Sequence, residues 1–242
     1  MSRTAAVVPA AGRGERLGPG APKALRLLGG VPILVHAVRA LATARSVDLV
    51  VVAAPSDGVA EVSSLLAEHG LLDAAPGRAA AVVVAGGASR QDSVGLALAA
   101  LPDDVDVVLV HDAARPLVPA SLVDAVASAV RGGADAVVPG LPVADTVKSV
   151  DAADVVSATL DRSSLRSIQT PQGFRREVLA AAHRAADPTA PATDDAGLVE
   201  GAGGKVVVVS GDEEAFKVTR PIDLVLAEAV LARRRAAGVV AG

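Results

Sequence analysis

Short apolar runs recur along the chain, and each is bounded by residues that favour turns. The runs are rich in Val and Ala and nearly continuous, a pattern typical of strands that are buried on both faces of a sheet. They cover Ala5–Pro9, Asp48–Ala53, Ala80–Ala85, Val105–His111, Ala134–Pro139 and Lys205–Ser210. Each run therefore predicts a buried strand.

Amphipathic, Ala-rich segments of helical length lie between these runs. They cover Ile33–Ala44, Asp57–His69, Gln91–Leu101, Ala120–Arg131 and Pro221–Arg235. Alternating strands and helices predict an α/β fold with a doubly wound, mostly parallel sheet. In such sheets ligands bind beyond the carboxyl ends of the strands. We expect a single domain over residues 1–242.

One stretch departs from this alternation and predicts a β-hairpin arm at about residues 141–162. Two extended runs, Val143–Val150 and Val155–Leu160, flank the turn-like tetrad Asp151–Asp154. An isolated two-stranded hairpin is marginal in water. We therefore expect the arm to pack on a second subunit of a homodimer, with packing back on its own domain as the alternative.

The composition excludes several classes of protein. Two Phe, no Trp or Tyr and a net charge of -4 argue against a nucleic-acid partner. The absence of Cys excludes disulfides, zinc–thiolate sites and thiol nucleophiles. No apolar stretch reaches the roughly 20 residues that span a bilayer. The N-terminal apolar run leads directly into a glycine loop, unlike a signal peptide. We expect a cytoplasmic protein without membrane partners.

A loop of small residues follows the first predicted strand and leaves several interpretations open. Gly12 and Gly14 fit the start of a dinucleotide fingerprint, but Leu17 occupies its third glycine position and no acidic residue ends the second strand. A P-loop would need Gly-Lys-Ser/Thr at the start of a helix, which is absent. A structural turn explains the glycines but not the cations Arg16 and Lys23, which suit a triphosphate.

Several segments together resemble a known family. Ala10-Ala11-Gly12-x-Gly14-x-Arg16-x-Gly18 with Pro22-Lys23 resembles the signature of sugar-phosphate nucleotidyltransferases. Further matching segments follow in order: Gly86-Gly87-x-x-Arg90-x-x-Ser93-Val94, Val110–Pro116, Asp145–Lys148, Asp161-Arg162, Thr170–Gln172 and Lys217–Pro221. The ordered set resembles the 2-C-methyl-D-erythritol 4-phosphate cytidylyltransferase family over about Ala5 to Leu231. The resemblance implies a Rossmann-like nucleotidyltransferase fold.

The resemblance also implies a reaction and a nucleotide site. A phosphate oxygen of the acceptor would attack the α-phosphorus of CTP, bound with Mg²⁺ or another divalent cation, and release pyrophosphate. Arg16 and Lys23 would stabilise charge on the triphosphate, whereas Ala10, Ala11, Gly12, Gly86 and Ser93 would hold cytosine and ribose. The residues alone allow a plain strand-ending turn at Gly86, a helix start at Ser93 and solvated surface charges at Arg16 and Lys23.

Acceptor binding is likewise implied by the resemblance. Substrate-binding roles fall to Asp112, Arg115, Thr146, Arg162, Thr170 and Lys217, of which Arg162 and Lys217 would also be catalytic by orienting the attacking phosphate. Arg162 and Thr170 are expected to come from the hairpin region of the neighbouring subunit. A local i,i+3 ion pair is the alternative for Asp112 and Arg115. His111 has no partner at ligand spacing, and we interpret it as structural.

The metal ligands are not specified by the sequence. Thr193–Ala196 favours a helix start with a cap and an acidic first turn, and a metal-binding pair of carboxylates at Asp194 and Asp195 is the alternative. Thr219–Pro221 favours another helix start, with Thr219 as the cap. Two other functions stay open: a cytidylyltransferase for another polyol phosphate, such as ribitol 5-phosphate, and a catalytically inactive nucleotide-binding regulator.

Overall fold

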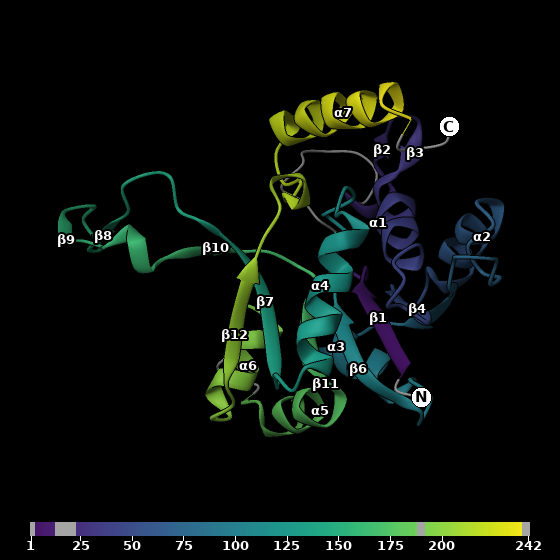
Figure 1. The fold of residues 1–242 in the computed structure, drawn as a ribbon, viewed down its shortest axis with the longest axis horizontal. Coiled ribbons are helices and arrows are strands. Elements are labelled where there is room, and N and C mark those ends of the chain that lie inside the picture. Colours follow the sequence, from purple (N-terminus) through teal and green to yellow (C-terminus); the bar gives the residue numbers. More distant parts are fainter. Residues whose placement is uncertain (1–2, 13–22, 188–191, 239–242) are drawn as a thin grey trace.

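A computed structural model describes residues 3–12, 23–187 and 192–238 and contains a twisted central sheet (Figure 1). The short strand β10 (Arg166–Ile168) pairs with the end of β7 (Ala136–Pro142), on the same side of that strand as β11 (Gln172–Arg175). The full strands are, in spatial order, β5 (Ala80–Ala85), β4 (Leu49–Ala54), β1 (Arg3–Pro9), β6 (Val105–Val110), β11 (Gln172–Arg175), β7 (Ala136–Pro142) and β12 (Val206–Ser210).

The sheet is mostly parallel, as predicted, with one antiparallel strand in its interior. β1 pairs in parallel with β4 and β6, β4 with β5, and β7 with β12. β11 runs antiparallel between β6 and β7 and was not predicted. Its sequence, Gln-Gly-Phe-Arg, lacks an apolar run, and Gly173 fits because a side chain there would lie 2.6 Å from Val126. The six predicted strands are confirmed, with ends that differ from the prediction by at most three residues.

Helices cover both faces of the sheet. The apolar sides of α1 (Ile33–Ala42), α2 (Val59–Glu68) and α4 (Ala120–Arg131) pack on one face. The other face is covered by α3 (Arg90–Ala99), α5 (Arg176–Ala185) and α6 (Asp195–Gly201). Because helices cover both faces of the sheet, the sequences of its strands are continuous apolar runs. The prediction missed α5.

The last helix, α7 (Pro221–Ala236), forms a separate small core at one end of the sheet (Figure 1). Its Ala227 and Leu231 pack with Leu28 and Ile33, near the two-residue strands β2 (Leu27–Leu28) and β3 (Val31–Pro32). In the described part of the chain, no helix is long and apolar enough to cross a membrane.

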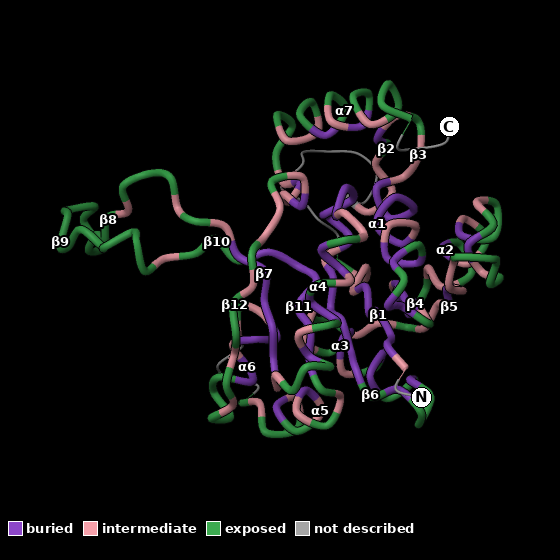
Figure 2. Tube along the Cα trace, in the orientation of Figure 1, coloured by how far each residue is buried: buried purple, intermediate pink, exposed green. Residues whose placement is uncertain are grey.

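The predicted hairpin arm is present and projects away from the sheet (Figures 1 and 2). Pairing of β7 with β10 forms its base, and β8 (Lys148–Val150) pairs with β9 (Val156–Thr159) at its tip. The strands are shorter than predicted. Asp151 shapes the turn, because its Oδ1 accepts hydrogen bonds from the N–H groups of Ala153 and Val155. The arm is exposed, so the alternative of packing back on its own domain is wrong.

Candidate functional site

A cavity of about 220 Å³ lies where the parallel strands β1 and β6 end and α3 begins. This is the edge of an α/β sheet at which ligands are expected. Small residues supply most of its wall, and charged side chains are grouped on one side. The described residues that line it are Pro9, Ala10, Ala11, Gly12, Ala24, Gly87, Ala88, Ser89, Arg90, Ser93, Asp112, Ala113, Ala114 and Lys217.

The loop after β1 forms one wall of this cavity. Ala10 continues the strand pairing, because its N–H donates to the carbonyl oxygen of Ala53 at 2.8 Å. Ala10, Ala11 and Gly12 line the cavity, as the predicted nucleotide-binding role requires. Arg16 lies outside the described residues. Lys23 begins the short helix η2 (Lys23–Leu25), and its side chain also lies outside the described part of the structure.

Gly86 and Ser93 shape the facing wall. A side chain at Gly86 would lie 2.9 Å from both the Ala11 Cβ and the Ser93 Oγ. The Ser93 hydroxyl accepts a hydrogen bond from the N–H of Gly87 at 3.1 Å and donates to the carbonyl of Ser89 at 2.8 Å. Ser89, not Ser93, caps α3. Gly86 is therefore where two walls approach closely, and Ser93 holds the turn between them.

The charged side of the cavity is built around Asp112. Its Oδ2 lies 2.7 Å from the Lys217 Nζ, and its Oδ1 lies 3.5 Å from the Arg90 Nε. Burial opposes ionisation of this carboxyl, but Lys217 and Arg90 hold its pKa at about 2. Asp112 is therefore a carboxylate at neutral pH, and two cations that line the cavity, Lys217 and Arg90, lie next to it.

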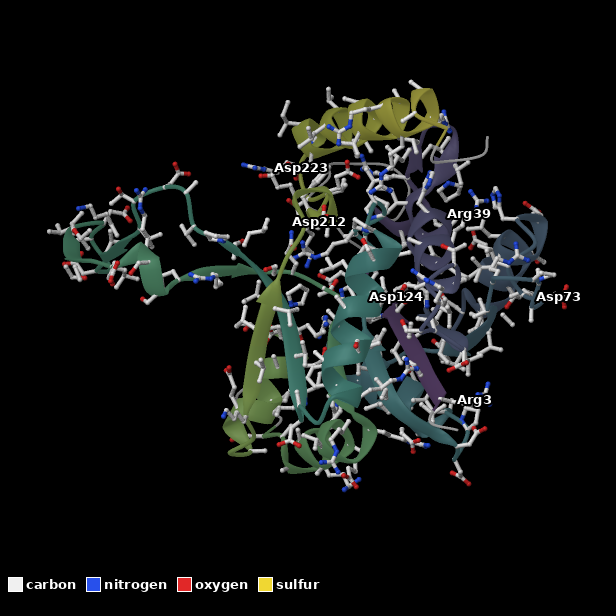
Figure 3. All side chains as sticks on the ribbon, viewed as in Figure 1. Arg3, Arg39, Asp73, Asp124, Asp212 and Asp223 are labelled. Carbon is white, nitrogen blue, oxygen red and sulfur yellow. The ribbon has the colours of Figure 1, made fainter. Side chains whose placement is uncertain are left out.

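Two carboxylates labelled in Figure 3, Asp212 and Asp223, shape the backbone on either side of Lys217 in the sequence. Asp212 accepts a hydrogen bond from the N–H of Glu214 at the start of η4 (Glu213–Ala215). Asp223 Oδ2 accepts from the N–H groups of Thr219 and Arg220, each at 2.8 Å. Pro221 starts α7 as predicted, but Arg220 rather than Thr219 occupies its N-cap position.

Arg115 contacts the backbone of two other segments. Its Nη1 donates to the carbonyl oxygen of Ala215 at 2.7 Å, and its Nη2 donates to that of Ile168 at 3.3 Å. The residue is buried, and its Nε lies 3.9 Å from Asp112 Oδ2. This geometry favours the ion-pair alternative: Arg115 ties backbone segments together behind Asp112, rather than facing the cavity.

Thr170 lies in the site of its own chain, whereas we expected it to reach that of a neighbour. Its hydroxyl accepts from the N–H of Asp112 at 3.0 Å and lies 3.0 Å from the Nδ1 of His111. His111 Nε2 lies 3.1 Å from the Arg115 carbonyl oxygen, which can only accept, so Nε2 carries the proton. Burial lowers the pKa of His111 to about 4, so Nδ1 accepts from Thr170. Both residues are structural supports of Asp112.

Thr146 and Arg162 lie on the arm and do not line the cavity of their own chain. Thr146 is exposed in the segment between β7 and β8. Arg162 is exposed at the start of η3 (Arg162–Ser164), and its guanidinium donates to the Ala144 carbonyl within the arm.

Arg90 is a cavity residue that sequence reasoning quoted but gave no role. Its Nη1 lies 2.6 Å from Asp195 Oδ2, and Asp195 Oδ1 lies 3.0 Å from His183 Nε2. Asp194 caps α6 through the N–H of Gly197 and also accepts from Gln172. The predicted helix start is confirmed. The carboxylates of Asp194 and Asp195 are thus already bound to protein groups, which disfavours the alternative of a metal-binding pair. The described residues contain no group of three potential protein metal ligands.

The family model of IspD, 2-C-methyl-D-erythritol 4-phosphate cytidylyltransferase, matches residues 4–233. The chain is 64% identical to the enzyme of that name from Streptomyces avermitilis, over 97% of this chain and 94% of the relative. It is 58% identical to that from Frankia casuarinae, over 96% and 82%.

Solved structures agree with this assignment. The crystal structure of 2-C-methyl-D-erythritol 4-phosphate cytidylyltransferase from Thermus thermophilus has a TM-score of 0.74 at 36% identity, covering 96% of this chain and all (100%) of the other. That of 4-diphosphocytidyl-2C-methyl-D-erythritol synthase from Anaerococcus prevotii has a TM-score of 0.79 at 26% identity, covering 96% and 99%. The chain belongs to the 2-C-methyl-D-erythritol 4-phosphate cytidylyltransferase family.

Proposed function

We propose that this chain transfers the cytidylyl group of CTP to 2-C-methyl-D-erythritol 4-phosphate, in the synthesis of isoprenoid precursors by the non-mevalonate route. The products are 4-diphosphocytidyl-2-C-methyl-D-erythritol and pyrophosphate. The observation that carries the proposal is the cavity at the carboxyl edge of the sheet, with small residues on its walls and Arg90 and Lys217 beside Asp112. The membership of the family supports the choice of both substrates.

The reaction needs electrostatic support more than acid–base chemistry. A phosphate oxygen of the acceptor, already an anion near neutral pH, forms a bond to the α-phosphorus of CTP. The bond between that phosphorus and the oxygen of the β-phosphate breaks, and pyrophosphate carries away the electron pair. The protein has to hold the two anions in line and offset the charge that develops at phosphorus.

The cations around the cavity divide this work. Lys217, fixed by Asp112 at 2.7 Å, is placed to orient the attacking phosphate. Arg16 and Lys23 follow Gly12 in the sequence, and we assign them to the triphosphate and the charge at the α-phosphorus. Asp112 retains carboxylate oxygens that can accept from acceptor hydroxyls.

The small residues select the base. Ala10, Ala11, Gly12 and Ser93 line the cavity, and Gly86 brings the two walls together. We assign cytosine and ribose to this part of the cavity. We expect the pocket to exclude a purine by size, and to distinguish UTP from CTP only through the polar groups at one edge of the base, which are costly to leave unpaired.

A divalent cation, Mg²⁺ by preference, is proposed to enter as a complex with CTP. Asp112 is the one carboxylate among the described lining residues, and Lys217 and Arg90 already neutralise it. The described residues therefore do not form a metal cage, and we assign no metal ligand to the chain. Such an ion is held mainly by phosphate oxygens and water, where it offsets phosphate charge.

We also propose that the enzyme is a cytoplasmic homodimer of one nucleotidyltransferase domain per chain, residues 1–242, joined through the arm. The arm exposes Val150, Val155, Val156 and Leu160, which need a partner surface. Thr146 and Arg162 do not line the cavity of their own chain, so we assign them to the acceptor phosphate in the partner's site.

The proposed function is tested by pyrophosphate release from CTP and Mg²⁺ with 2-C-methyl-D-erythritol 4-phosphate or ribitol 5-phosphate as the acceptor. We expect rapid release with the first and at least tenfold lower kcat/KM with the second. ATP in place of CTP should give little product. A Lys217→Ala sample purified in the same way controls for contaminating enzymes. Higher kcat/KM with ribitol 5-phosphate, or no release with either acceptor, would refute the assignment.

A further inference from the structure

Arg90 connects the cavity to a carboxylate that lies outside it. It is the first residue of α3, and its side chain lines the cavity while remaining partly exposed. The Nε edge of the guanidinium faces Asp112 at 3.5 Å, and Nη1 contacts Asp195 at 2.6 Å. Asp195 is only 1% exposed and comes from α6, so it has no access to a ligand. Asp195 can therefore act on the site only through Arg90.

Asp195 is itself held from a second direction. His183, on α5, donates from Nε2 to Asp195 Oδ1 at 3.0 Å, and Arg90 contacts the other oxygen. Burial alone would raise the pKa of Asp195, but the hydrogen bond from His183 and the charge of Arg90 hold it below its ordinary value. Asp195 is therefore a fixed negative charge beneath the cavity wall, oriented by both partners.

This arrangement leaves one part of the Arg90 guanidinium available. Its Nη2 has no hydrogen-bond acceptor among the residues that the structure describes, whereas the other two nitrogens face carboxylates. A guanidinium is planar and rigid, so the hydrogen bond of Nη1 to Asp195, together with the longer ion pair of Nε with Asp112, restricts where the third nitrogen points. A phosphate oxygen in the cavity is the partner that such a nitrogen prefers.

We propose that Asp195, supported by His183, is a positioning residue for the cytidylyl transfer: it orients Arg90 so that this side chain binds a substrate phosphate and braces Asp112. The inference rests on the proposed function and assigns a role to a carboxylate that touches no substrate. The phosphate belongs either to CTP or to the acceptor, and separate KM values distinguish the two. An ion pair of this kind adds little to the stability of the fold, because apolar residues at a buried position often stabilise a protein equally well.

A double-mutant cycle separates positioning from a structural role. Asp195→Asn is nearly isosteric and removes the charge that holds Arg90. We expect it to lower kcat/KM about tenfold in the parent enzyme, a factor that corresponds to about 1.4 kcal/mol. In an Arg90→Gln background the same change should alter kcat/KM less than twofold, because the side chain through which Asp195 acts is gone. KM for CTP and for the acceptor is measured in each variant.

Asp194→Asn provides a matched control. Asp194 lies next to Asp195 and caps α6, but it bonds to Gly197 and Gln172 instead of Arg90. Its effect should be the same in both Arg90 backgrounds. Thermal unfolding of every variant confirms that the kinetics are measured on folded protein, and His183→Gln replaces Asp195→Asn if the latter does not fold.

Equal effects of Asp195→Asn in the two backgrounds would overturn the positioning role, as would parent-like kinetics of Asp195→Asn. Both outcomes require an active parent enzyme. An inactive parent would instead reject the proposed function. In that case isothermal titration of CTP into the same four proteins of the cycle still tests the coupling: additive losses of affinity, or no loss, would reject it.

Discussion

Lys217 Nζ lies 2.7 Å from Asp112 Oδ2, although 105 positions separate the two residues in the chain. Lys217 reaches this position from the segment that links η4 to α7, and Asp112 follows β6. The pair thus joins two separate segments at the carboxyl edge of the sheet. The contact keeps Asp112 ionised and fixes the ammonium at the cavity.

Lys217→Ala should reduce kcat about 100-fold, because it removes a cation from the reacting phosphates and leaves Asp112 with a weaker set of partners. Steady-state pyrophosphate release at saturating CTP measures this loss. Lys205→Ala is the control, since Lys205 is exposed before β12 and does not line the cavity, and it should stay within twofold of the parent. A Lys217→Ala enzyme with nearly normal kcat would exclude the catalytic role.

Gly86→Ala should raise KM for CTP at least tenfold and destabilise the fold by about 1–3 kcal/mol. The added methyl would lie 2.9 Å from Ala11 and Ser93 and 3.0 Å from the Ala54 carbonyl oxygen. The walls of the cavity would have to separate. Gly201→Ala, where nothing lies within 4 Å, should leave both KM and stability nearly unchanged. If Gly86→Ala binds CTP normally, the base pocket lies elsewhere.

Acid should destabilise the protein below about pH 6.5 through His111. Burial lowers its pKa to about 4, so the unfolded state binds a proton that the folded state does not. This contribution to stability is complete above pH 6.5 and is lost as the pH falls towards 4, with a slope of at most about 1.4 kcal/mol per pH unit. Burial also lowers the pKa of His36, which adds to the slope in the same direction.

Urea unfolding at several pH values between 7.5 and 4.5 measures that slope. His111→Gln should show a shallower dependence than the parent, whatever its absolute stability, because one titrating group has been removed. Asp112, with its pKa at about 2, remains ionised throughout this range. Identical slopes in parent and His111→Gln would show that His111 does not carry the acid sensitivity.

Mixing two inactive variants, Lys23→Ala and Arg162→Ala, should restore activity if the site is shared between subunits. One site of each mixed dimer then carries both changes and the other carries neither. Random pairing makes half of the dimers mixed, so about a quarter of all sites should be intact. Pyrophosphate release is measured after the subunits are dissociated and re-paired. If Arg162 instead acts in the site of its own chain, the mixture should remain inactive even after subunit exchange has been demonstrated.

Local pattern was sufficient for much of the architecture. The continuous Val-rich runs predicted the parallel strands, because burial on both faces leaves no polar alternation in the sequence. The resemblance to the family assigned Ala10–Gly12 and Gly86 to the nucleotide; Ala10, Ala11 and Gly12 line the cavity, as does Gly87 next to Gly86. The hairpin arm also followed from its turn, since Asp151 makes its bonds within a few residues.

Tertiary contacts decided what no local pattern contained. β11 has no apolar run, and its position in the sheet depends on the space that Val126 and Val130 leave beside Gly173. Arg115 and Thr170 were assigned to substrate from the resemblance, and their long-range contacts with Ala215 and His111 were not part of that prediction. Asp195 was predicted only as part of a helix start, and packing of α3, α5 and α6 brings Arg90 and His183 to it. Hydrogen bonds between distant segments depend on the final distances between atoms, and a spacing along the chain does not record those distances.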